Sequence, residues 1–435
     1  MPCIVFHGDE RAILVPKGTS ILKASLENKI PHYAECGGQG KCTTCRVKVF
    51  SGMENLMTRN EVEMKQAQSR NWESYIRLAC QSKIMGDIVV ERLVKNELHV
   101  QEAYLEKYYS QPPLKKELIL LKIKITGFEK ELRVSERQVV EVYNQVFFFI
   151  QDILLLTGAN SEIHDSYHVL GYYGLITEKN LLQNAYQAVF LIQSLFQAKQ
   201  KEWEKKLQSK INLLIALNQA KCLIGTYNFQ NKKTVQVLGN LIPKALKLIK
   251  ICSKIKVSCL VSEDIYQNSK EFIRYKKKFT IENKVSKTQM RVFEPRGYLK
   301  DDPTYIFLES YFEIKDRFIE FAKKIYELLF ERNPRYLELF QADMTKQYKV
   351  LANVLKTFVY GICRLEDITP MLRELGRRHK YLYGVQKDYF LEFEKCILIA
   401  MKEMLIDWNE KKEQAWKKTM DKLIEKILEG YEEDF

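Results

Sequence analysis

The sequence predicts a multidomain protein: an α+β domain over residues 1–98, an α/β domain over residues 115–298 and an all-α domain over residues 303–435. Three observations indicate this division. A chain of 435 residues can hold two to four domains with separate cores. Short strand-like runs alternate with turns in the first segment, strand and helix patterns mix in the second, and a 3.6-residue period dominates the third. Pro112–Pro113 and the stretch GYLKDDP (297–303) carry linker signals between the segments.

The composition indicates a folded protein outside the membrane. Apolar residues make up 46% of the chain, which is ordinary for a globular protein. No run of 18 uncharged apolar residues occurs, and the start MPCIVFHGDERAIL lacks a signal-peptide pattern, so we expect a cytoplasmic location. The net charge of +14 is concentrated in residues 115–290, which carry 28 Lys and Arg against 15 Asp and Glu. This basic segment fits an anionic partner or a solvated lysine-rich face, and no nucleic-acid-binding motif accompanies it.

The first segment contains a loop rich in cysteine and glycine. The runs CIVF, AILV, CRVKVF and DIVVERLV predict strands, and residues 22–26 predict a short helix. Between them, Cys36, Cys42 and Cys45 follow the spacing C-x5-C-x2-C, and Cys80 lies 35 positions later. Four thiolates can ligate a [2Fe–2S] cluster, two per iron, and glycines let such a loop adopt positive φ angles. Zinc is the alternative, although zinc sites usually carry two C-x2-C pairs and this loop carries one.

The motifs CGGQGKCTTC and RLACQ make residues 1–95 resemble the [2Fe–2S] ferredoxins of the adrenodoxin and bacterial type. The resemblance implies a β-grasp fold and one-electron transfer. It also implies that the cluster ligands are Cys36, Cys42, Cys45 and Cys80. Cys3 falls in the first predicted strand, where we expect a core residue.

In the helical segment, the stretch LRELGRRHKYLYGV (372–385) contains one of only six histidines. Leu372, Leu375 and His379 share one helix face by their spacing. Thr369–Pro370 has the features of a helix start and Gly384 those of a stop, which would place His379 in the last turn of a short helix. On spacing alone, such a histidine is more often packed in a core than bound to a metal.

The neighbouring stretches change this interpretation. FIEFAKKIYELLFERNPRYLELF (318–340), DMTKQYKVLANVL (343–355) and LGRRHKYLYGV together resemble the globins, particularly bacterial globins and the haem domain of flavohaemoglobins. The resemblance covers residues 303–435 and implies a haem b with His379 as proximal iron ligand. It places Phe340 against the haem, Tyr326 and Gln347 on the distal side facing bound O₂ or NO, Leu351 above the distal pocket, and Tyr389 on the proximal side.

The residue types agree with these roles. A neutral imidazole is a good axial ligand for iron, and a Tyr hydroxyl and a Gln amide can donate hydrogen bonds to a bound gas. The alternative for Tyr326 is an ordinary place in a helix core, because apolar residues surround it in the sequence. Cys363 and Cys396 lie on apolar helix faces and are expected in the core.

The basic middle segment resembles the class III nucleotide cyclases in the order of its strand and helix patterns (residues 117–132, 139–174, 217–251, 258–267 and 288–295). The catalytic positions differ. The two metal-binding aspartates of the family would fall at Lys124 and Tyr167, and its transition-state Asn and Arg at Pro243 and Lys247. Asp165 could replace one aspartate only if the register slips. A metal-dependent phosphoryl-transfer enzyme needs its carboxylates, so we expect a degenerate cyclase-like domain without cyclase activity.

The combination predicts a haem and iron–sulfur redox protein in which the ferredoxin domain supplies electrons to an O₂-binding globin, with oxidation of nitric oxide as candidate chemistry. No GxGxxG segment stands between a strand and a helix, so the electrons must come from a separate reductase or from a dimer mate. The alternative is a gas or redox sensor whose cyclase-like domain regulates a partner or forms a homodimer. A gas-regulated cyclase ranks last because the carboxylates are missing.

Overall fold

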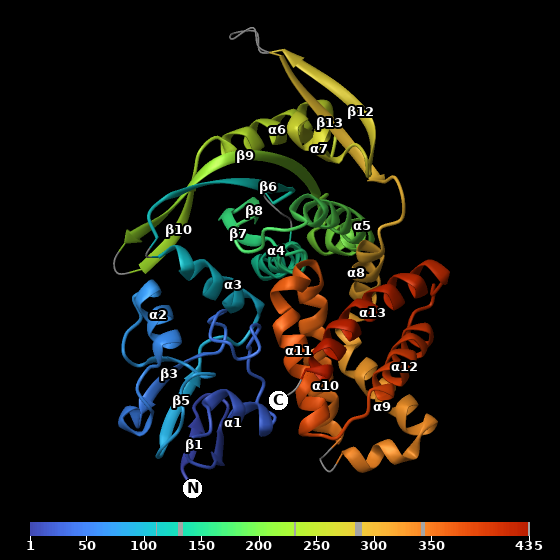
Figure 1. The fold of residues 1–435 in the computed structure, drawn as a ribbon. Coiled ribbons are helices and arrows are strands. Elements are labelled where there is room, and N and C mark those ends of the chain that lie inside the picture. Colours follow the sequence, from blue (N-terminus) through green and yellow to red (C-terminus); the bar gives the residue numbers. More distant parts are fainter. Residues whose placement is uncertain (110, 129–133, 230–231, 283–288, 341–343, 434–435) are drawn as a thin grey trace. The chain divides into compact units, whose positions relative to one another are not determined.

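The computed structural model describes residues 1–109, 111–128, 134–229, 232–282, 289–340 and 344–433 (Figure 1). Parts of the sequence motifs quoted above, at residues 129–132, 230–231, 288 and 343, lie outside these ranges. The chain divides into two compact units. The first joins Met1–Gln111 with Ile306–Phe435, and the second is Pro112–Tyr305. Each unit is described in turn.

The N-terminal part of the first unit is an α+β fold, as predicted. Its five-stranded sheet has the order β2-β1-β5-β3-β4. The strands are β1 (Cys3–Phe6), β2 (Arg11–Leu14), β3 (Arg46–Ser51), β4 (Ile76–Leu78) and β5 (Ile88–Arg92), and the helices are α1 (Ile21–Glu27) and α2 (Glu61–Arg70). Ile4 and Phe6 alternate with less buried neighbours and are fully buried, which fixes the face of β1 that meets the core. Ser20 caps α1 by accepting a hydrogen bond from the Lys23 N–H.

A helix that the sequence did not signal follows this sheet and returns over the cysteine loop. It comprises α3 (Glu97–Leu105) and the 3₁₀ turn η2 (Glu106–Tyr108). Arg46 pairs with Glu106 at 2.8 Å, and the Thr43 hydroxyl donates to the Ala103 carbonyl at 3.4 Å. The domain boundary expected at residue 98 therefore falls inside α3.

The C-terminal part of the first unit is all-α, as predicted. Its α-helices are α8 (Pro303–Ile314, whose first three residues belong to the second unit), α9 (Phe318–Arg332), α10 (Met344–Gly361), α11 (Leu365–Tyr381), α12 (Asp388–Met404) and α13 (Glu410–Glu432), and its 3₁₀ turns include η4 (Pro334–Leu339) and η5 (Ile362–Arg364). Helices α11 and α13 cross at two glycines. A Cβ at Gly376 would come within 1.9 Å of the Ile427 carbonyl oxygen, and one at Gly430 within 1.9 Å of the Arg373 carbonyl oxygen. Only glycine allows this approach.

The predicted helix start at Thr369–Pro370 is wrong, because α11 begins at Leu365 and Pro370 lies inside it. The tertiary packing explains the earlier start. Ile368 is fully buried and packs against Gly361. A Cβ added to Gly361 would lie 2.3 Å from the Cδ1 atom of Ile368. Burial of such a side chain contributes about 1.5–3 kcal/mol, which offsets the single helical hydrogen bond that a proline removes near a helix N-terminus. The last turn of α11 does contain His379, as predicted.

The second unit is an α/β fold built on one eight-stranded sheet, in the order β12-β13-β11-β9-β6-β8-β7 with β10 paired to β9. The strands are β6 (Leu114–Thr126), β7 (Asn160–Asp165), β8 (His168–Tyr173), β9 (Asn212–Phe229), β10 (Lys232–Leu238), β11 (Cys259–Ser262), β12 (Ile273–Glu282) and β13 (Gln289–Tyr298). The helices are α4 (Glu136–Leu156), α5 (Leu181–Leu207), α6 (Leu241–Ile255) and α7 (Glu263–Ser269). Strands β6 and β9 lie between α4 and α5 on one side and α6 on the other (Figure 1).

The stretch 258–267, which the resemblance to the cyclases assigns to a closing strand, is a strand only in its first part. In SCLVSEDIYQ only Cys259–Ser262 is a strand, and Glu263–Ser269 is helix α7. Ser262 has an extended backbone, and Glu263 and Asp264 occupy the first turn, where acidic side chains favour a helix N-terminus.

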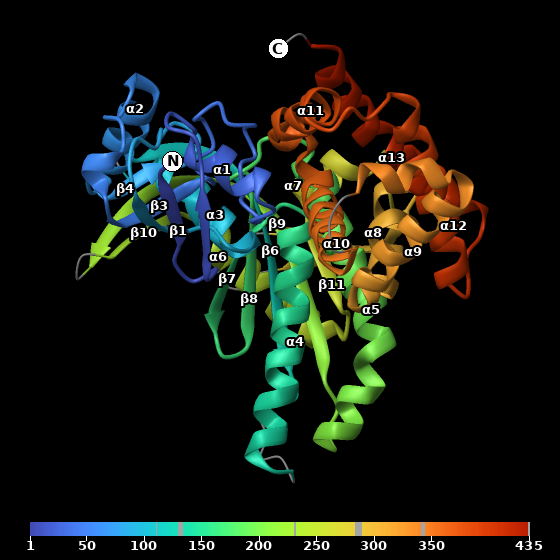
Figure 2. The same cartoon turned by 90° about the horizontal axis from the view of Figure 1, so that it is seen from below.

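Helix α4 is the one helix in the described part of the chain that is long and apolar enough to cross a membrane by length and composition. One face of the helix nevertheless belongs to the core, while Val140 and Phe148 are exposed. Val142, Val146, Ile150 and Ile153 recur at helical spacing and are fully buried. Helix α5 runs beside α4 (Figure 2), and the Trp203 indole donates a hydrogen bond to Gln145 at 3.1 Å.

Candidate functional site

The four cysteines of the first unit converge. The strongest electrostatic influences between their thiols join Cys36 to Cys42 and Cys45 to Cys80. Backbone and amide donors point at the sulfurs. The Cys36 N–H lies 3.3 Å from the Cys42 Sγ, and the Gln81 side-chain amide lies 3.3 Å from the Cys80 Sγ. The loop turns through Gly37, Gly38 and Gly40, whose φ angles of +58°, +87° and +71° are those that the glycines were predicted to supply.

Within each pair, one thiol is the better acid. The hydrogen bond from Cys42 lowers the pKa of Cys36 to about 5, and the same contact together with burial raises the pKa of Cys42. The Cys45 contact lowers the pKa of Cys80, while it and burial raise the pKa of Cys45. Cys36 and Cys80 thus have lower thiol pKa values than Cys42 and Cys45.

The grouping of donors distinguishes a binuclear cluster from a single metal ion. A [2Fe–2S] cluster takes two thiolates per iron, whereas structural zinc takes four ligands around one point. The strongest influences between the thiols join the cysteines two and two, which matches the first arrangement. Among the residues the structure describes, no group of three or more His, Cys, Asp or Glu side chains could hold one metal ion. The cysteines therefore fit an iron–sulfur cluster.

On the helical side, His379 is prepared to act as an axial ligand. Its Nδ1 lies 2.8 Å from the Leu375 carbonyl oxygen, so Nδ1 carries the proton and Nε2 keeps its lone pair. Burial lowers the pKa of His379, which keeps the imidazole neutral. The rings of Tyr383 and Phe390 each lie 5.6 Å from the imidazole centroid to centroid and restrict its rotation. The donor set fits a haem.

The two predicted distal residues contact each other. The Gln347 side-chain amide donates to the Tyr326 hydroxyl at 3.1 Å. Burial raises the pKa of Tyr326 to about 12, so the phenol stays protonated at neutral pH and can donate a hydrogen bond. The Phe340 ring stands edge-on to Tyr326 with centroids 5.1 Å apart, and Leu351 is buried one turn after Gln347.

Tyr389 is placed differently from the other predicted residues. Its ring packs against Tyr336 at 4.4 Å, and the contact with His379 comes from the next residue, Phe390. Phe390 is thus a residue that sequence reasoning missed, and no spacing signal would have found it. Cys363 and Cys396 are buried, as expected of core residues.

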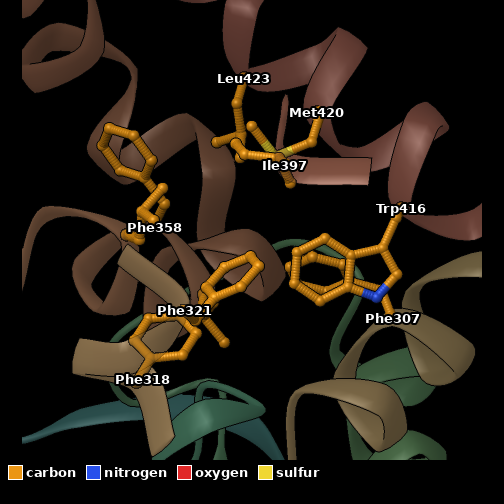
Figure 3. A pocket seen from close by; sticks show the side chains of 10 residues that line it. Phe307, Phe318, Phe321, Phe358, Ile397, Trp416, Met420 and Leu423 are labelled. Atoms are coloured by element: carbon orange, nitrogen blue, oxygen red, sulfur yellow. The ribbon is translucent and has the colours of Figure 1, made fainter. Parts of the chain in front are cut away.

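A small cavity lies elsewhere in the helical part (Figure 3). Its volume is about 10 Å³, close to the minimum that one water molecule needs. Apolar side chains line it: Phe307, Phe318, Phe321, Leu355, Phe358, Val359, Ile397, Trp416, Met420 and Leu423. None of the predicted haem residues is among them, so this void is a packing feature and not the haem site.

Asp165, the carboxylate that could replace a lost cyclase aspartate, is engaged within its own turn. Asp165 accepts hydrogen bonds from the Tyr167 N–H and from His168 Nδ1, both at 2.8 Å, and so closes the turn between β7 and β8. Lys124 lies on β6 opposite His168. Sequence reasoning missed Lys122, two residues earlier, which is fully buried and whose Nζ has no hydrogen-bond partner among the described residues. Burial lowers the pKa of Lys122 to about 8.

A buried polar network joins the cysteine loop to the helical part of the same unit. Arg364, at the end of η5, places its Nη2 atom 2.5 Å from Glu35 Oε1, directly before Cys36. The second oxygen of Glu35 accepts from the Tyr104 hydroxyl at 2.5 Å. Glu97 lies 3.6 Å from Arg364 and accepts from the Tyr33 hydroxyl at 3.1 Å. The side chains of Glu35 and Arg364 are 0% and 8% exposed.

Two further contacts link the same parts. A Cβ placed on Gly37 would lie 2.5 Å from the Pro370 carbonyl oxygen in α11. Lys29, just after α1, places its Nζ 3.4 Å from Gln347 Oε1 in α10. The cysteine-bearing part therefore touches both the helix that carries His379 and the helix that carries Gln347.

Family models match the two ends of the chain. Residues 4–85 match the 2Fe-2S iron-sulfur cluster binding domain, and residues 323–427 match the globin family. The chain thus contains a ferredoxin-type domain and a globin domain, and these imply an iron–sulfur cluster and a haem. The four cysteines and the predicted haem residues lie within the matched residues.

Curated relatives resemble one end of the chain each. An uncharacterized globin-like protein of Aquifex aeolicus is 29% identical over 26% of this chain and 81% of its own length. The flavohemoprotein of Bacillus anthracis is 29% identical over 21% of this chain and 23% of its own length. A component of the Na(+)-translocating NADH-quinone reductase of Chlamydia felis is 31% identical over 23% of this chain. The match spans only 20% of that reductase component.

Solved structures similar to this chain include nucleotide cyclases. The adenylyl cyclase CyaB from P. aeruginosa is 15% identical, with a TM-score of 0.38, and the match covers 44% of this chain and 98% of that one. The guanylyl cyclase Cya2 is 12% identical, with a TM-score of 0.37, and the match covers 43% of this chain and 95% of that one. At these TM-scores the likeness carries no argument, so the cyclase-like nature of the second unit stays a prediction from the sequence.

Proposed function

We propose that this protein is a cytoplasmic redox protein in which the ferredoxin domain (1–98) supplies electrons to the globin domain (303–435). The ligands would be Cys36, Cys42, Cys45 and Cys80 for a [2Fe–2S] cluster and His379 for a haem b. When bound, the cluster supplies one-electron chemistry and the haem supplies a site for O₂ or NO. The observation that carries the proposal is that α11 touches the cysteine loop at Pro370 and bears His379 nine residues later.

The contact provides a short and continuous route through the protein. Nine helical residues span about 14 Å along the helix axis. Gly37 packs against the Pro370 carbonyl at one end, and the Leu375 carbonyl accepts the hydrogen bond of His379 Nδ1 at the other. The route would therefore consist of one non-bonded contact between Gly37 and Pro370, the backbone and hydrogen bonds of α11, and one side-chain hydrogen bond.

The protein's own residues would control the gas site. Tyr326 and Gln347 would donate hydrogen bonds to the ligand. The phenol of Tyr326 stays protonated, and the Gln347 amide donates to the Tyr326 hydroxyl, so the two polar groups lie together. Phe340 and Leu351 would exclude water from this side. Such a pocket suits oxygen or nitric oxide chemistry better than rapid release of gas.

The partners follow from what the chain would need. An external reductase would supply the electrons, and the similarity to parts of a flavohemoprotein and of an NADH-quinone reductase supports this class of donor. The cyclase-like domain (115–298) would serve for homodimerisation or to bind an anionic ligand, without cyclase activity. Neither nucleic acid nor a membrane is expected as a partner.

Anaerobic stopped-flow spectroscopy of the full-length holoprotein tests the proposal. A ferredoxin reductase reduces the cluster rapidly, and the cluster and haem bands are followed separately. We expect haem reduction to follow cluster reduction at a rate that does not depend on protein concentration. A haem that stays oxidised beside a reduced cluster would refute electron supply and favour the sensor function.

The sensor is the second candidate function. Asp165 is engaged by Tyr167 and His168, so it does not replace a lost cyclase aspartate. A cyclase-like domain without catalytic carboxylates can still transmit a signal, and this favours the sensor. Steady-state consumption of nitric oxide in the presence of O₂ and of the reductase separates the two, because an enzyme must turn over repeatedly and a sensor need only change state once.

A further inference from the structure

We propose that Gly37 and Arg364 are positioning residues that hold the cysteine loop against helix α11 and thereby set the rate of electron transfer within the chain. This inference rests on the proposed function and deepens it, because it names the residues that define where electrons leave the ferredoxin domain. Neither residue is expected to ligate iron or to contact the gas.

The steric argument concerns Gly37. Its φ of +58° is accessible to other residues only at a cost, and a Cβ there would meet three atoms of the globin domain. These are the Pro370 carbonyl oxygen at 2.5 Å, the Pro370 carbonyl carbon at 3.1 Å and the Glu374 Cβ at 3.2 Å. The missing side chain is therefore what lets the loop approach α11.

Gly38 offers an internal comparison. Its φ is +87°, so a side chain there is also strained by the backbone. A Cβ at Gly38 would meet only Cys80 and Leu22 of the ferredoxin domain, both at an ordinary 3.9 Å. The two neighbouring glycines thus share the backbone requirement, and only Gly37 faces the globin.

The electrostatic argument concerns Arg364. Its guanidinium is buried between carboxylates of the ferredoxin part, Glu35 at 2.5 Å and Glu97 at 3.6 Å. The ring of Tyr104 lies 5.9 Å from it. A buried charge without its partner is strongly unfavourable. Placements of the cysteine loop that separate Arg364 from Glu35 are therefore disfavoured.

The step that these residues position is a simple exchange. One electron is lost by the reduced cluster and one is gained by the haem iron, while no bond or proton is transferred. The reductant that restores the cluster is the external ferredoxin reductase of the proposed function. Since the globin covers the loop at Gly37, an external acceptor protein is excluded from that point of the ferredoxin surface.

The test compares Gly37→Ala with Gly38→Ala in the full-length holoprotein. Visible spectra first establish that each variant holds its cluster and haem. Stopped-flow then gives the rate of haem reduction after rapid cluster reduction. Hydrogen exchange of the amides in residues 34–40 and 364–374 reports the contact independently of electron transfer. Arg364→Lys, outside the loop, is the second variant, because it keeps the charge and loses the planar fork.

We expect Gly37→Ala to slow haem reduction by roughly tenfold or more, because a displacement of about 1 Å is enough to weaken a step that depends on fixed geometry. Gly38→Ala should stay close to the wild-type rate, and Arg364→Lys should be slowed. Exchange in both segments should rise in Gly37→Ala and Arg364→Lys only. If Gly37→Ala loses its cluster, Arg364→Lys decides the outcome.

Equal behaviour of the two alanine variants, or unchanged exchange in Gly37→Ala and Arg364→Lys, would overturn the positioning role. A wild-type protein whose haem is never reduced would instead refute the proposed function. In that case the exchange data still decide whether Gly37 and Arg364 hold the contact, and the assignment of the rate to them would be wrong.

Discussion

Replacing Arg364 with Met should destabilise the first unit by about 3 kcal/mol. Removal of one partner from a buried ion pair costs about 3–5 kcal/mol, because the other charge stays in the interior without compensation. Arg364 lies 2.5 Å from Glu35, whose side chain is fully buried, and 3.6 Å from Glu97. The Tyr104 hydroxyl continues to donate to Glu35, which places the expected loss at the lower end of that range.

The assay is urea denaturation of the full-length holoprotein, with loss of the cluster absorbance as the signal for the first unit. Arg332→Met is the matched control. Arg332 pairs with Glu392 at 3.0 Å on an exposed face of the globin domain, where a pair is worth less than about 1 kcal/mol. A double-mutant cycle with Glu35→Gln isolates the interaction between the two partners.

In this cycle, Arg364→Met and Glu35→Gln together should cost less than the two single changes added, with a coupling of about 1–3 kcal/mol. The reasoning fails if Arg364→Met costs no more than Arg332→Met. It fails equally if the two single effects simply add, since additivity would mean that Arg364 and Glu35 do not stabilise each other.

Three further predictions concern other sites. His379→Ala should abolish the haem spectrum and leave the cluster spectrum, whereas Cys42→Ser should abolish the cluster spectrum and leave the haem spectrum. Visible absorption of the purified variants checks both. Retention of both spectra in both variants would show that the sites are misassigned. Lys122→Met should stabilise the second unit by about 1–3 kcal/mol, because it removes a buried amine without a partner. Burial lowers the pKa of Lys122 from 10.5 to about 8, so the part of this gain that comes from the buried charge should be full below pH 8 and be lost as the pH rises to 10.5. Denaturation at several pH values measures it, and a constant gain would contradict it. Leu423→Ala should enlarge the apolar cavity and cost about 2–5 kcal/mol in thermal or urea unfolding, against less than about 0.5 kcal/mol for the exposed Leu391→Ala.

The local motifs were readable from the sequence because their spacing carries the chemistry. Cys36, Cys42 and Cys45 lie within ten residues, and the glycines between them signal the turns of the loop. The fold classes of the three segments followed from hydrophobic periodicity, which is also a local property. The position of His379 in the last turn of a helix followed in the same way, although the start of that helix did not.

The sequence-based expectations that were wrong concern places where tertiary contacts or local charge decide the structure. Pro370 lies inside α11 because Ile368 packs against Gly361, and Glu263–Ser269 turns helical directly after a strand. In the first case a packing contact, and in the second an acidic first turn, outweighed the pattern expected for the stretch. The contact of Phe390 with His379 likewise depends on the turn between two helices, which spacing does not encode.

The sequence by itself determined which redox groups the two ends can hold, because ligand spacing is a short-range property of the chain. Tertiary structure alone decided that these ends meet. Glu35 and Arg364 are separated by 329 positions, and neither residue stands in a pattern that names the other. The buried carboxylate of Glu35 needs a cation, and only the folded chain shows that this cation is Arg364. The same packing brings Gly37 into contact with the helix that carries His379.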